Sequence, residues 1–373
     1  MGLSSLFVLI LLSLLGFTLV WKIPYPRRED QPPSLPPGGI SVIIPARNEE
    51  ENLARLLPSL SEQGLKPIEV ILIDDHSEDG TAAIGQREGC RVIPSLELPE
   101  GWAGKPWGCW QGANQARGDL FLFLDADTFL EKDGLEKLAS TYLQGGGLLT
   151  VQPYHRMEKA NERLSAIFNI LVLAGMNAFT PWRGLAKPMG AFGPCNLCSR
   201  DDYFAVGGHE RVKGEVLESL GLAKEFQKKN LPVRCYGGKG TISFRMYPGG
   251  VRSLIEGFSK GFGTGAKAMS PGILFMTVGW ITGGVGVVRH VLHSFSLGDW
   301  SWLFQAGALY GLYAIQFHWM LRRMGNFGVL TALFFPVPLL FFVGVFALSF
   351  FRIFLMGKVR WKGREVRTRK KEG

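Results

Sequence analysis

The stretch GDLFLFLDAD, residues 118–127, decides the fold of this chain. Its apolar run predicts a buried parallel strand. Asp125 and Asp127 end the run two residues apart, so we expect both side chains on one side of the strand's carboxyl end. Open α/β sheets bind ligands in the crevice outside that end, and carboxylates there suit Mg²⁺ or Mn²⁺ shared with substrate phosphates. Taken alone, such a pair more often caps a helix or bounds a turn.

Two earlier segments repeat the pattern of a strand, a polar turn and a helix. Residues 40–44, ISVII, run into the turn PARNEE at 45–50, and leucines follow at helical spacing. Residues 68–73, IEVILI, run into DDHSEDGT at 74–81. This order predicts an α/β fold with a doubly wound, mostly parallel, nucleotide-binding sheet. Neither turn carries the glycine pattern of a dinucleotide site or a P-loop.

These three motifs together resemble the inverting family 2 glycosyltransferases, which have the GT-A fold. The resemblance implies that Asp125 meets the ribose or the sugar and that Asp127 ligates Mg²⁺ or Mn²⁺ on the diphosphate. It also implies a uridine pocket lined by Pro45, Ala46, Glu49 and Asp75.

Two further positions complete the expected site. Within GWAGKPWG at 101–108, glycines permit close approach to a ligand and Lys105 can neutralise a phosphate, unless the segment is a plain surface loop. Glu218 falls where the family carries an acidic pair whose second member is the catalytic base, but Ser219 occupies that second position. A serine hydroxyl scarcely ionises at neutral pH, so this departure favours an acceptor that is already an anion, such as a carboxylic acid. The alternative is that Glu218 itself becomes the base.

The five cysteines are an odd number in a domain that we place in the cytosol, so reduced thiols are expected. Cys195 and Cys198 have zinc-like spacing but lack a second pair, which favours ordinary buried thiols. The segments AFGPCN at 191–196 and GGHE at 207–210 look like the loops that enclose the donor sugar in the family.

Apolar segments at both ends of the chain predict attachment to a membrane. Residues 3–21 are long enough to span a bilayer and carry no charge, and Lys22, Arg27 and Arg28 place the following side in the cytoplasm. Near the other end, residues 251–269 read as an interfacial helix. Further apolar segments lie at 273–292, 302–321 and 327–356, the last broken at Pro336-Val337-Pro338.

The net charge of +9 is concentrated beside apolar segments, which fits a surface facing anionic lipid and not nucleic acid. A cytoplasmic basic tail requires the last apolar segment to turn back near its prolines, whereas a plain span puts the tail outside. We expect an N-terminal anchor at 1–22, a Pro-rich linker at 23–39, a GT-A domain at 40–250, an interfacial helix at 251–270, membrane helices at 271–356 and a basic tail at 357–373.

The segments VQPYH at 151–155, FRMY at 244–247 and WKGR at 361–364 resemble a narrower group, the glycosyltransferases of C30 carotenoid acids. That group esterifies glucose from UDP-glucose onto the carboxyl group of a carotenoid. The resemblance implies a UDP-sugar donor, a lipophilic carotenoid acceptor and a multi-pass enzyme of the cell membrane with a cytoplasmic catalytic domain. Two alternatives stay open. One is another lipid acceptor, such as a polyprenyl phosphate, a hopanoid or a diacylglycerol; the other is a membrane scaffold with a vestigial nucleotide fold.

Overall fold

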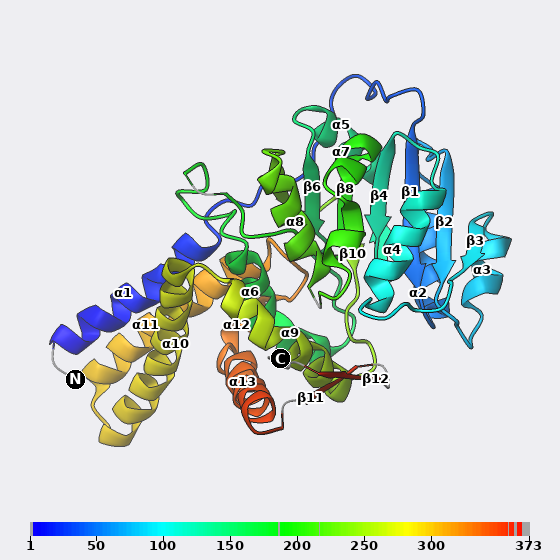
Figure 1. The fold of residues 1–373 in the computed structure, drawn as a ribbon. Coiled ribbons are helices and arrows are strands. Elements are labelled where there is room, and N and C mark those ends of the chain that lie inside the picture. Colours follow the sequence, from blue (N-terminus) through cyan, green and yellow to red (C-terminus); the bar gives the residue numbers. More distant parts are fainter. Residues whose placement is uncertain (1–2, 186, 216, 357, 362–363, 368–373) are drawn as a thin grey trace. The chain divides into compact units, whose positions relative to one another are not determined.

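A computed structural model describes residues 3–185, 187–215, 217–356, 358–361 and 364–367 (Figure 1). The chain divides into two compact units. The sheet unit comprises residues 23–155 and 187–245, and the helical unit comprises residues 1–22, 156–186 and 246–373. The domain bounds that we expect from the sequence stay a prediction.

The sheet unit is built on seven strands in the order β3-β2-β1-β4-β8-β6-β9 (Figure 1). Neighbours along β3-β2-β1-β4 and in the β6-β9 pair are parallel, and β8 runs antiparallel to both β4 and β6. A mostly parallel α/β sheet of the GT-A type is therefore confirmed. The strands are β1 (Ile40–Ala46), β2 (Glu69–Asp74), β3 (Arg91–Pro94), β4 (Leu120–Leu124), β6 (Leu148–Gln152), β8 (Cys195–Ser199) and β9 (Val233–Gly237).

Helices cover both faces of this sheet because its central strands are apolar on both sides. In β4, Leu120, Leu122 and Leu124 join the core beneath α2 (Glu50–Ser61) and α5 (Gly134–Leu143). Phe121 and Phe123 alternate to the opposite face, which carries α4 (Gly104–Gln115), α7 (Arg200–Ala205) and α8 (Glu218–Lys228). This two-sided burial is what a continuous apolar strand predicts.

Smaller elements complete the sheet unit. A second sheet has the order β5-β10-β7, formed by β5 (Thr128–Leu130), β10 (Ile242–Phe244) and β7 (Tyr154–His155). The remaining helices are α3 (Thr81–Arg87) and the short 3₁₀ helix η2 (Gly208–Val212).

The helical unit contains α1 (Leu3–Leu19), the 3₁₀ helix η1 (Ala160–Ser165), α6 (Ala166–Gly175), α9 (Val251–Ala268), α10 (Pro271–Leu297), α11 (Trp300–Leu321), α12 (Val329–Leu333) and α13 (Pro336–Met356). A hairpin of β11 (Lys358–Trp361) and β12 (Arg364–Arg367) follows. The apolar segment 327–356 is interrupted between α12 and α13, directly before Pro336, as its prolines suggest.

Within the helical unit, α1 packs on a glycine face of α10. A Cβ atom added at Gly283 would lie 3.0 Å from the backbone nitrogen of Ser13, so the two helices approach closely. Gln316 of α11 joins the same contact: its amide donates to the Ser13 carbonyl at 2.8 Å and its oxygen accepts from the indole N–H of Trp280 at 2.9 Å. The N-terminal helix is thus a packed member of a helical bundle.

Replacing Gly283 with leucine should lower the free energy of unfolding by about 1–3 kcal/mol, because the side chain has no room against α1. Gly311→Leu in α11 is the matched control, since a Cβ there meets nothing within 4 Å and leucine favours the helix. Thermal unfolding of the full chain in detergent compares the two. An equal melting temperature for both variants would contradict the close α1–α10 contact.

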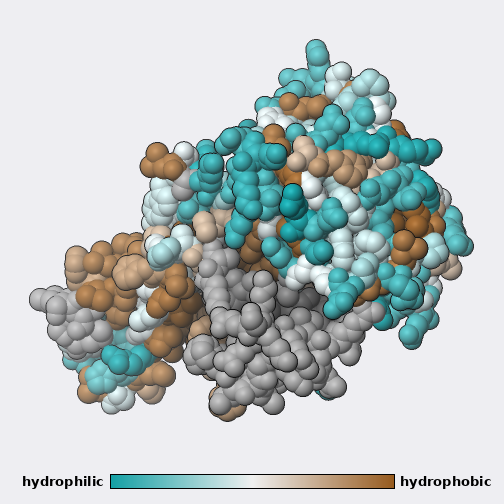
Figure 2. Space-filling view, in the orientation of Figure 1, coloured by the Kyte–Doolittle hydropathy of each residue, from teal (hydrophilic) through white to brown (hydrophobic). Residues whose placement is uncertain are grey.

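By length and composition, one helix of the described residues, α10, is able to cross a bilayer. Residues 6–19 and 336–349 form shorter apolar helices, so several membrane spans are not confirmed. Large apolar side chains are nevertheless exposed on the helical unit, including Phe275 at 73%, Trp300 at 82% and Phe304 at 80%. Figure 2 shows apolar residues gathered over α1 and its neighbouring helices, whereas the visible surface of the sheet unit is mostly hydrophilic.

Candidate active site

The turns after β1 and β2 are tied to each other by reciprocal hydrogen bonds. The Asn48 amide oxygen accepts from the backbone of Glu78 at 2.8 Å, and the Asn48 backbone donates to the Ser77 hydroxyl at 3.0 Å. Glu50 accepts from the Gly80 backbone at 2.9 Å. Asn48 also has φ +53°, a left-handed conformation that asparagine tolerates well. Many polar residues of the two motifs therefore hold the turns together.

This arrangement holds three predicted site residues at the edge of the sheet where β1 and β2 end. The backbone N–H of Glu49 donates to the Thr81 hydroxyl at 2.8 Å, and the backbone N–H of Asp75 donates to the Ala46 carbonyl at 2.8 Å. The Asp75 carboxylate lies 3.6 Å from the Arg47 guanidinium. Glu49 and Asp75 are thus held on neighbouring turns, with Ala46 beside them at the end of β1.

Asp125 and Asp127 follow the end of β4 in a turn. The backbone N–H of Asp125 donates to the Pro194 carbonyl at 2.9 Å, and Thr128 closes the turn through the Asp125 carbonyl. Burial, the Asp125 carboxylate and the Glu49 carboxylate together raise the pKa of Asp127 to about 8. The Oδ1 atom of Asp127 is buried and has no hydrogen-bond partner within the described part of the chain.

Lys105 lies in the first turn of α4 and not in the plain surface loop that is the alternative to a ligand-binding segment. Gly108 brings the helix against β1, since a Cβ atom there would be 3.0 Å from the Cβ of Pro45. The Lys105 ammonium is 2.6 Å from Asp125 Oδ1 and 3.1 Å from Glu218 Oε1, and it donates to the Gly193 carbonyl at 3.2 Å. Burial would lower the pKa of Lys105, but the two carboxylates raise it, so the side chain stays charged.

Glu218 begins α8 and is buried beside Ser219, whose hydroxyl donates to Glu218 Oε1 at 3.3 Å. Burial alone would raise the pKa of Glu218. The ion pair with Lys105 outweighs it, and the pKa lies below the ordinary value. A carboxylate whose pKa is lowered binds a proton weakly.

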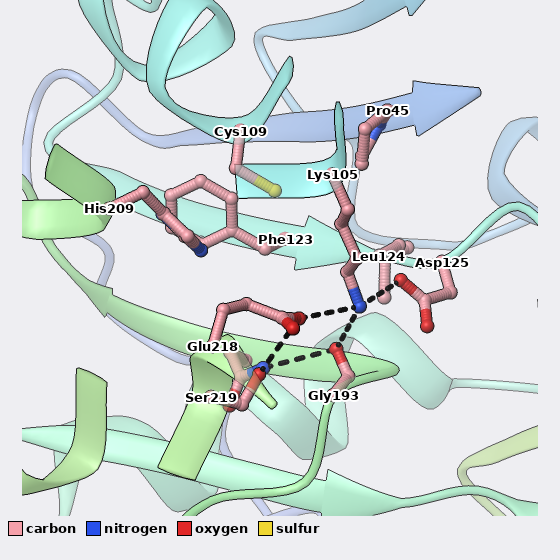
Figure 3. A pocket seen from close by; sticks show the side chains of 11 residues that line it. Pro45, Lys105, Cys109, Phe123, Leu124, Asp125, Gly193, His209, Glu218 and Ser219 are labelled. Atoms are coloured by element: carbon pink, nitrogen blue, oxygen red, sulfur yellow. Dashed lines mark hydrogen bonds and ion pairs between the residues drawn. The ribbon is translucent and has the colours of Figure 1, made fainter. Parts of the chain in front are cut away.

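A pocket in the sheet unit brings four of the predicted residues together: Pro45, Lys105, Asp125 and Glu218 (Figure 3). Ala46, Glu49, Asp75 and Asp127 do not line it, although Glu49 and Asp127 interact electrostatically with Asp125. The pocket is also lined by Gly193, Asn196 and His209, which lie in the two segments expected to enclose the sugar, and by Ser219. The sequence does not single out the remaining lining residues, which are Cys109, Phe123 and Leu124. The lining residues come from strands and helices far apart in the chain, so no local motif marks them as a group.

The cysteines are thiols, as the sequence predicts. Cys195 and Cys198 lie on opposite faces of β8, in the two separate cores, so they do not form a common metal site. Burial raises the pKa of each of these two thiols.

The described residues contain no group of three or more His, Cys, Asp or Glu side chains arranged around a metal position. Asp127 still fits a divalent cation that is shared with a nucleotide diphosphate. Its Oδ1 is a buried oxygen without a hydrogen-bond partner in the described residues, and the neighbouring carboxylates make its negative charge unfavourable. A hard cation would relieve both conditions, with the phosphates and water supplying the other oxygens.

A mostly parallel sheet with carboxylates gathered at its strand ends is compatible with a glycosyltransferase, and the chain belongs to glycosyltransferase family 2. The profile of that family matches residues 41–205. The 4,4'-diaponeurosporenoate glycosyltransferase of Staphylococcus aureus strain USA300 is 37% identical over 337 residues, which cover 89% of each chain. Its counterpart in strain MRSA252 is 36% identical over the same length.

Solved structures show weaker likeness. A mannosyltransferase of Pyrobaculum calidifontis, in complex with GDP-Man and Mn²⁺, is 14% identical with a TM-score of 0.49, covering 84% of this chain and 99% of the other. The family match and the S. aureus relatives show that the chain is a glycosyltransferase, related to those enzymes at moderate identity.

Proposed function

We propose that this chain is a membrane-bound inverting glycosyltransferase that transfers glucose from UDP-glucose to the carboxyl group of 4,4'-diaponeurosporenoate, giving a glucosyl ester. The ion pair of Glu218 with Lys105 beside Ser219 carries this proposal, because it leaves the expected base position without an effective proton acceptor. The name of the S. aureus relatives supplies the acceptor, and 37% identity over most of the chain supports the transfer of that assignment.

The acceptor class follows from proton chemistry. A hydroxyl must lose its proton as it attacks, and a general base contributes about 10²- to 10⁴-fold to such a step. Ser219 is no such base, and Glu218 is a weak one because Lys105 stabilises its ionised form. A carboxylic acid, with a pKa of about 4–5, is already ionised at pH 7 and needs neither residue as a base.

The reaction is a single displacement. An oxygen of the acceptor carboxylate forms a bond to the anomeric carbon as the bond to the diphosphate oxygen breaks. The electron pair leaves with UDP, and attack from the opposite face gives the β-ester. Lys105 holds Asp125 and Glu218 in fixed orientations around the sugar.

The donor roles remain those expected from the resemblance. Asp125 meets the sugar or ribose, and Asp127 holds Mg²⁺ or Mn²⁺, which as a Lewis acid would stabilise charge on the leaving diphosphate. The uridine is surrounded by Pro45, Ala46, Glu49 and Asp75.

The membrane assignment rests on the apolar length of α10 and on the exposed aromatic side chains of α10 and α11. Carotenoid acids dissolve in bilayers, so an enzyme anchored there meets its acceptor directly. We place the catalytic domain on the cytoplasmic side because basic residues follow α1. A cytoplasmic tail would require the segment around α12 and α13 to turn back within the membrane.

The deciding experiment incubates the purified full chain in detergent with labelled UDP-glucose, Mn²⁺ and either the carotenoid acid or a control lipid. We expect an alkali-labile glucosyl ester from the acid and no product from diacylglycerol. If glucose is transferred preferentially to a polyprenyl phosphate, which also needs no base, the carotenoid acid is not the acceptor and the lipid phosphate is. If the chain fails to bind UDP in the presence of Mn²⁺, the enzyme hypothesis is wrong and the alternative of a membrane scaffold is favoured.

A further inference from the structure

Tyr203 and His209 form a hydrogen-bonded pair at the candidate site. Tyr203 is fully buried in α7 and His209 is 4% exposed in η2. The Tyr203 hydroxyl lies 2.9 Å from Nδ1 of His209 and also accepts the backbone N–H of His209 at 3.1 Å. The Tyr203 hydroxyl thus contacts both the ring and the backbone of His209.

This geometry determines which ring nitrogen of His209 carries the proton. The Tyr203 hydroxyl has a single hydrogen, and its oxygen already accepts the backbone N–H. If Nδ1 were protonated, it too would donate to that oxygen, and the buried hydroxyl hydrogen would lose its acceptor in this pair. Buried donors are almost always satisfied, so the hydroxyl donates to Nδ1 and the ring proton resides on Nε2.

The two glycines before His209 make the pair possible. Gly207 has φ +82° and Gly208 has φ +50°, conformations that disfavour other residues. A Cβ at Gly208 would lie 2.5 Å from the Tyr203 ring. The sequence GGH therefore brings the His209 backbone against the tyrosine hydroxyl, whereas its likeness to the family predicts a loop around the sugar.

His209 is also one of the residues that line the pocket. His209 lines the pocket together with Glu218 and Ser219, on the side away from Pro45 (Figure 3). Its ring packs edge-on against Phe123, with 5.0 Å between the ring centroids. Burial lowers the pKa of His209 to about 4, so the ring is neutral at physiological pH.

We propose that His209 binds the acceptor, presenting Nε2–H as a neutral donor to a carboxylate oxygen in the pocket. This deepens the proposed function and rests on it for the acceptor class. The only ammonium that lines the pocket in the described residues, Lys105, is already shared by Asp125 and Glu218. A neutral N–H directed at an ionised oxygen makes a short, strong hydrogen bond without placing a second cation beside Glu218.

The tautomer is tested first, without any substrate. Long-range proton–nitrogen NMR on the full chain with ¹⁵N-labelled histidine should show His209 protonated at Nε2 alone, with its signals identified by their loss in His209→Gln. Tyr203→Phe removes the donor to Nδ1 and should shift or mix the tautomers. A wild-type spectrum with the proton on Nδ1 overturns the proposal even if Tyr203→Phe fails to fold.

Acceptor binding is tested by a pair of variants. His209→Phe keeps an aromatic ring against Phe123 but lacks the N–H, and should raise KM for the carotenoid acid by about 10- to 100-fold while KM for UDP-glucose changes less than threefold. His209→Gln retains a terminal N–H and should recover most of the loss. Equal acceptor KM in His209→Phe and wild type overturns the proposal.

The outcomes separate this inference from the proposed function. If wild type transfers glucose to a polyprenyl phosphate and not to the acid, the acceptor assignment fails. The tautomer and the KM ratio of His209→Phe to wild type, measured then with the phosphate, still decide whether His209 donates to an anionic acceptor; an unchanged ratio overturns that role.

Discussion

Asp127→Ala should reduce glucose transfer by at least about 10³-fold, because it removes the carboxylate assigned to the divalent cation. Stabilising charge on a leaving diphosphate supplies several kcal/mol, and each 1.36 kcal/mol corresponds to about a factor of ten in rate. Transfer is measured with labelled UDP-glucose over a range of Mn²⁺ concentrations. Asp127→Asn should be equally inactive, since it keeps the shape but loses the charge.

Asp127→Asn should leave the metal-free fold intact or make it more stable. Asp127 has a buried oxygen without a hydrogen-bond partner in the described residues, and its pKa is raised to about 8 by burial and neighbouring carboxylates. Removing an unfavourable charge therefore separates catalysis from folding. Asp201→Asn, at an exposed position in α7, is the control. Turnover of Asp127→Asn within tenfold of wild type would exclude the metal role.

Ser219→Asp should convert the acceptor preference from acids toward alcohols. The new carboxylate would stand at the base position, and transfer to a lipid alcohol such as farnesol should rise by about 10²-fold. Transfer to the carotenoid acid should fall, because Glu218 and the new carboxylate would both repel the acceptor while the Lys105 ammonium is already shared by Asp125 and Glu218. Competition between labelled acid and alcohol acceptors measures both changes in one assay.

Ser219→Asn is the matched control for this exchange, because it adds similar volume without a negative charge. It should lower transfer to both acceptors and create no alcohol activity. If wild type already glucosylates farnesol as fast as the acid, the argument from the missing base is wrong.

The sequence predicts the main sheet well because the apolar composition of its strands indicates that they are buried. The run from Leu120 to Leu124 is apolar at every position, and only a strand covered on both faces needs that. The motifs after β1, β2 and β4 also lie at one edge of the sheet, since parallel strands end together. Local pattern and tertiary position coincide in these cases.

The interior of the site is less predictable because its contacts join distant segments. Lys105 meets Asp125 and Glu218 across 20 and 113 positions of sequence, so its two ion pairs leave no spacing signal. The Tyr203–His209 pair is local, and the glycines at 207 and 208 are a signal for it. Those glycines are equally compatible with an open loop. Only the buried hydroxyl of Tyr203, which the structure shows, distinguishes the hydrogen-bonded pair from such a loop.

The reciprocal bonds between the turns after β1 and β2 constrain how the sequences of these two turns could change. The side chains of Asn48 and Glu50 accept backbone N–H groups of the second turn, and the Ser77 hydroxyl accepts the backbone N–H of Asn48. Replacing any of these three side chains therefore leaves a backbone N–H of the other turn without its partner. Effects of such coupled residues do not add. An engineer who transplants the first turn of a relative with another nucleotide would have to transplant the second as well. The two turns therefore have to change together in evolution, although more than twenty residues of helix and strand separate them in the sequence.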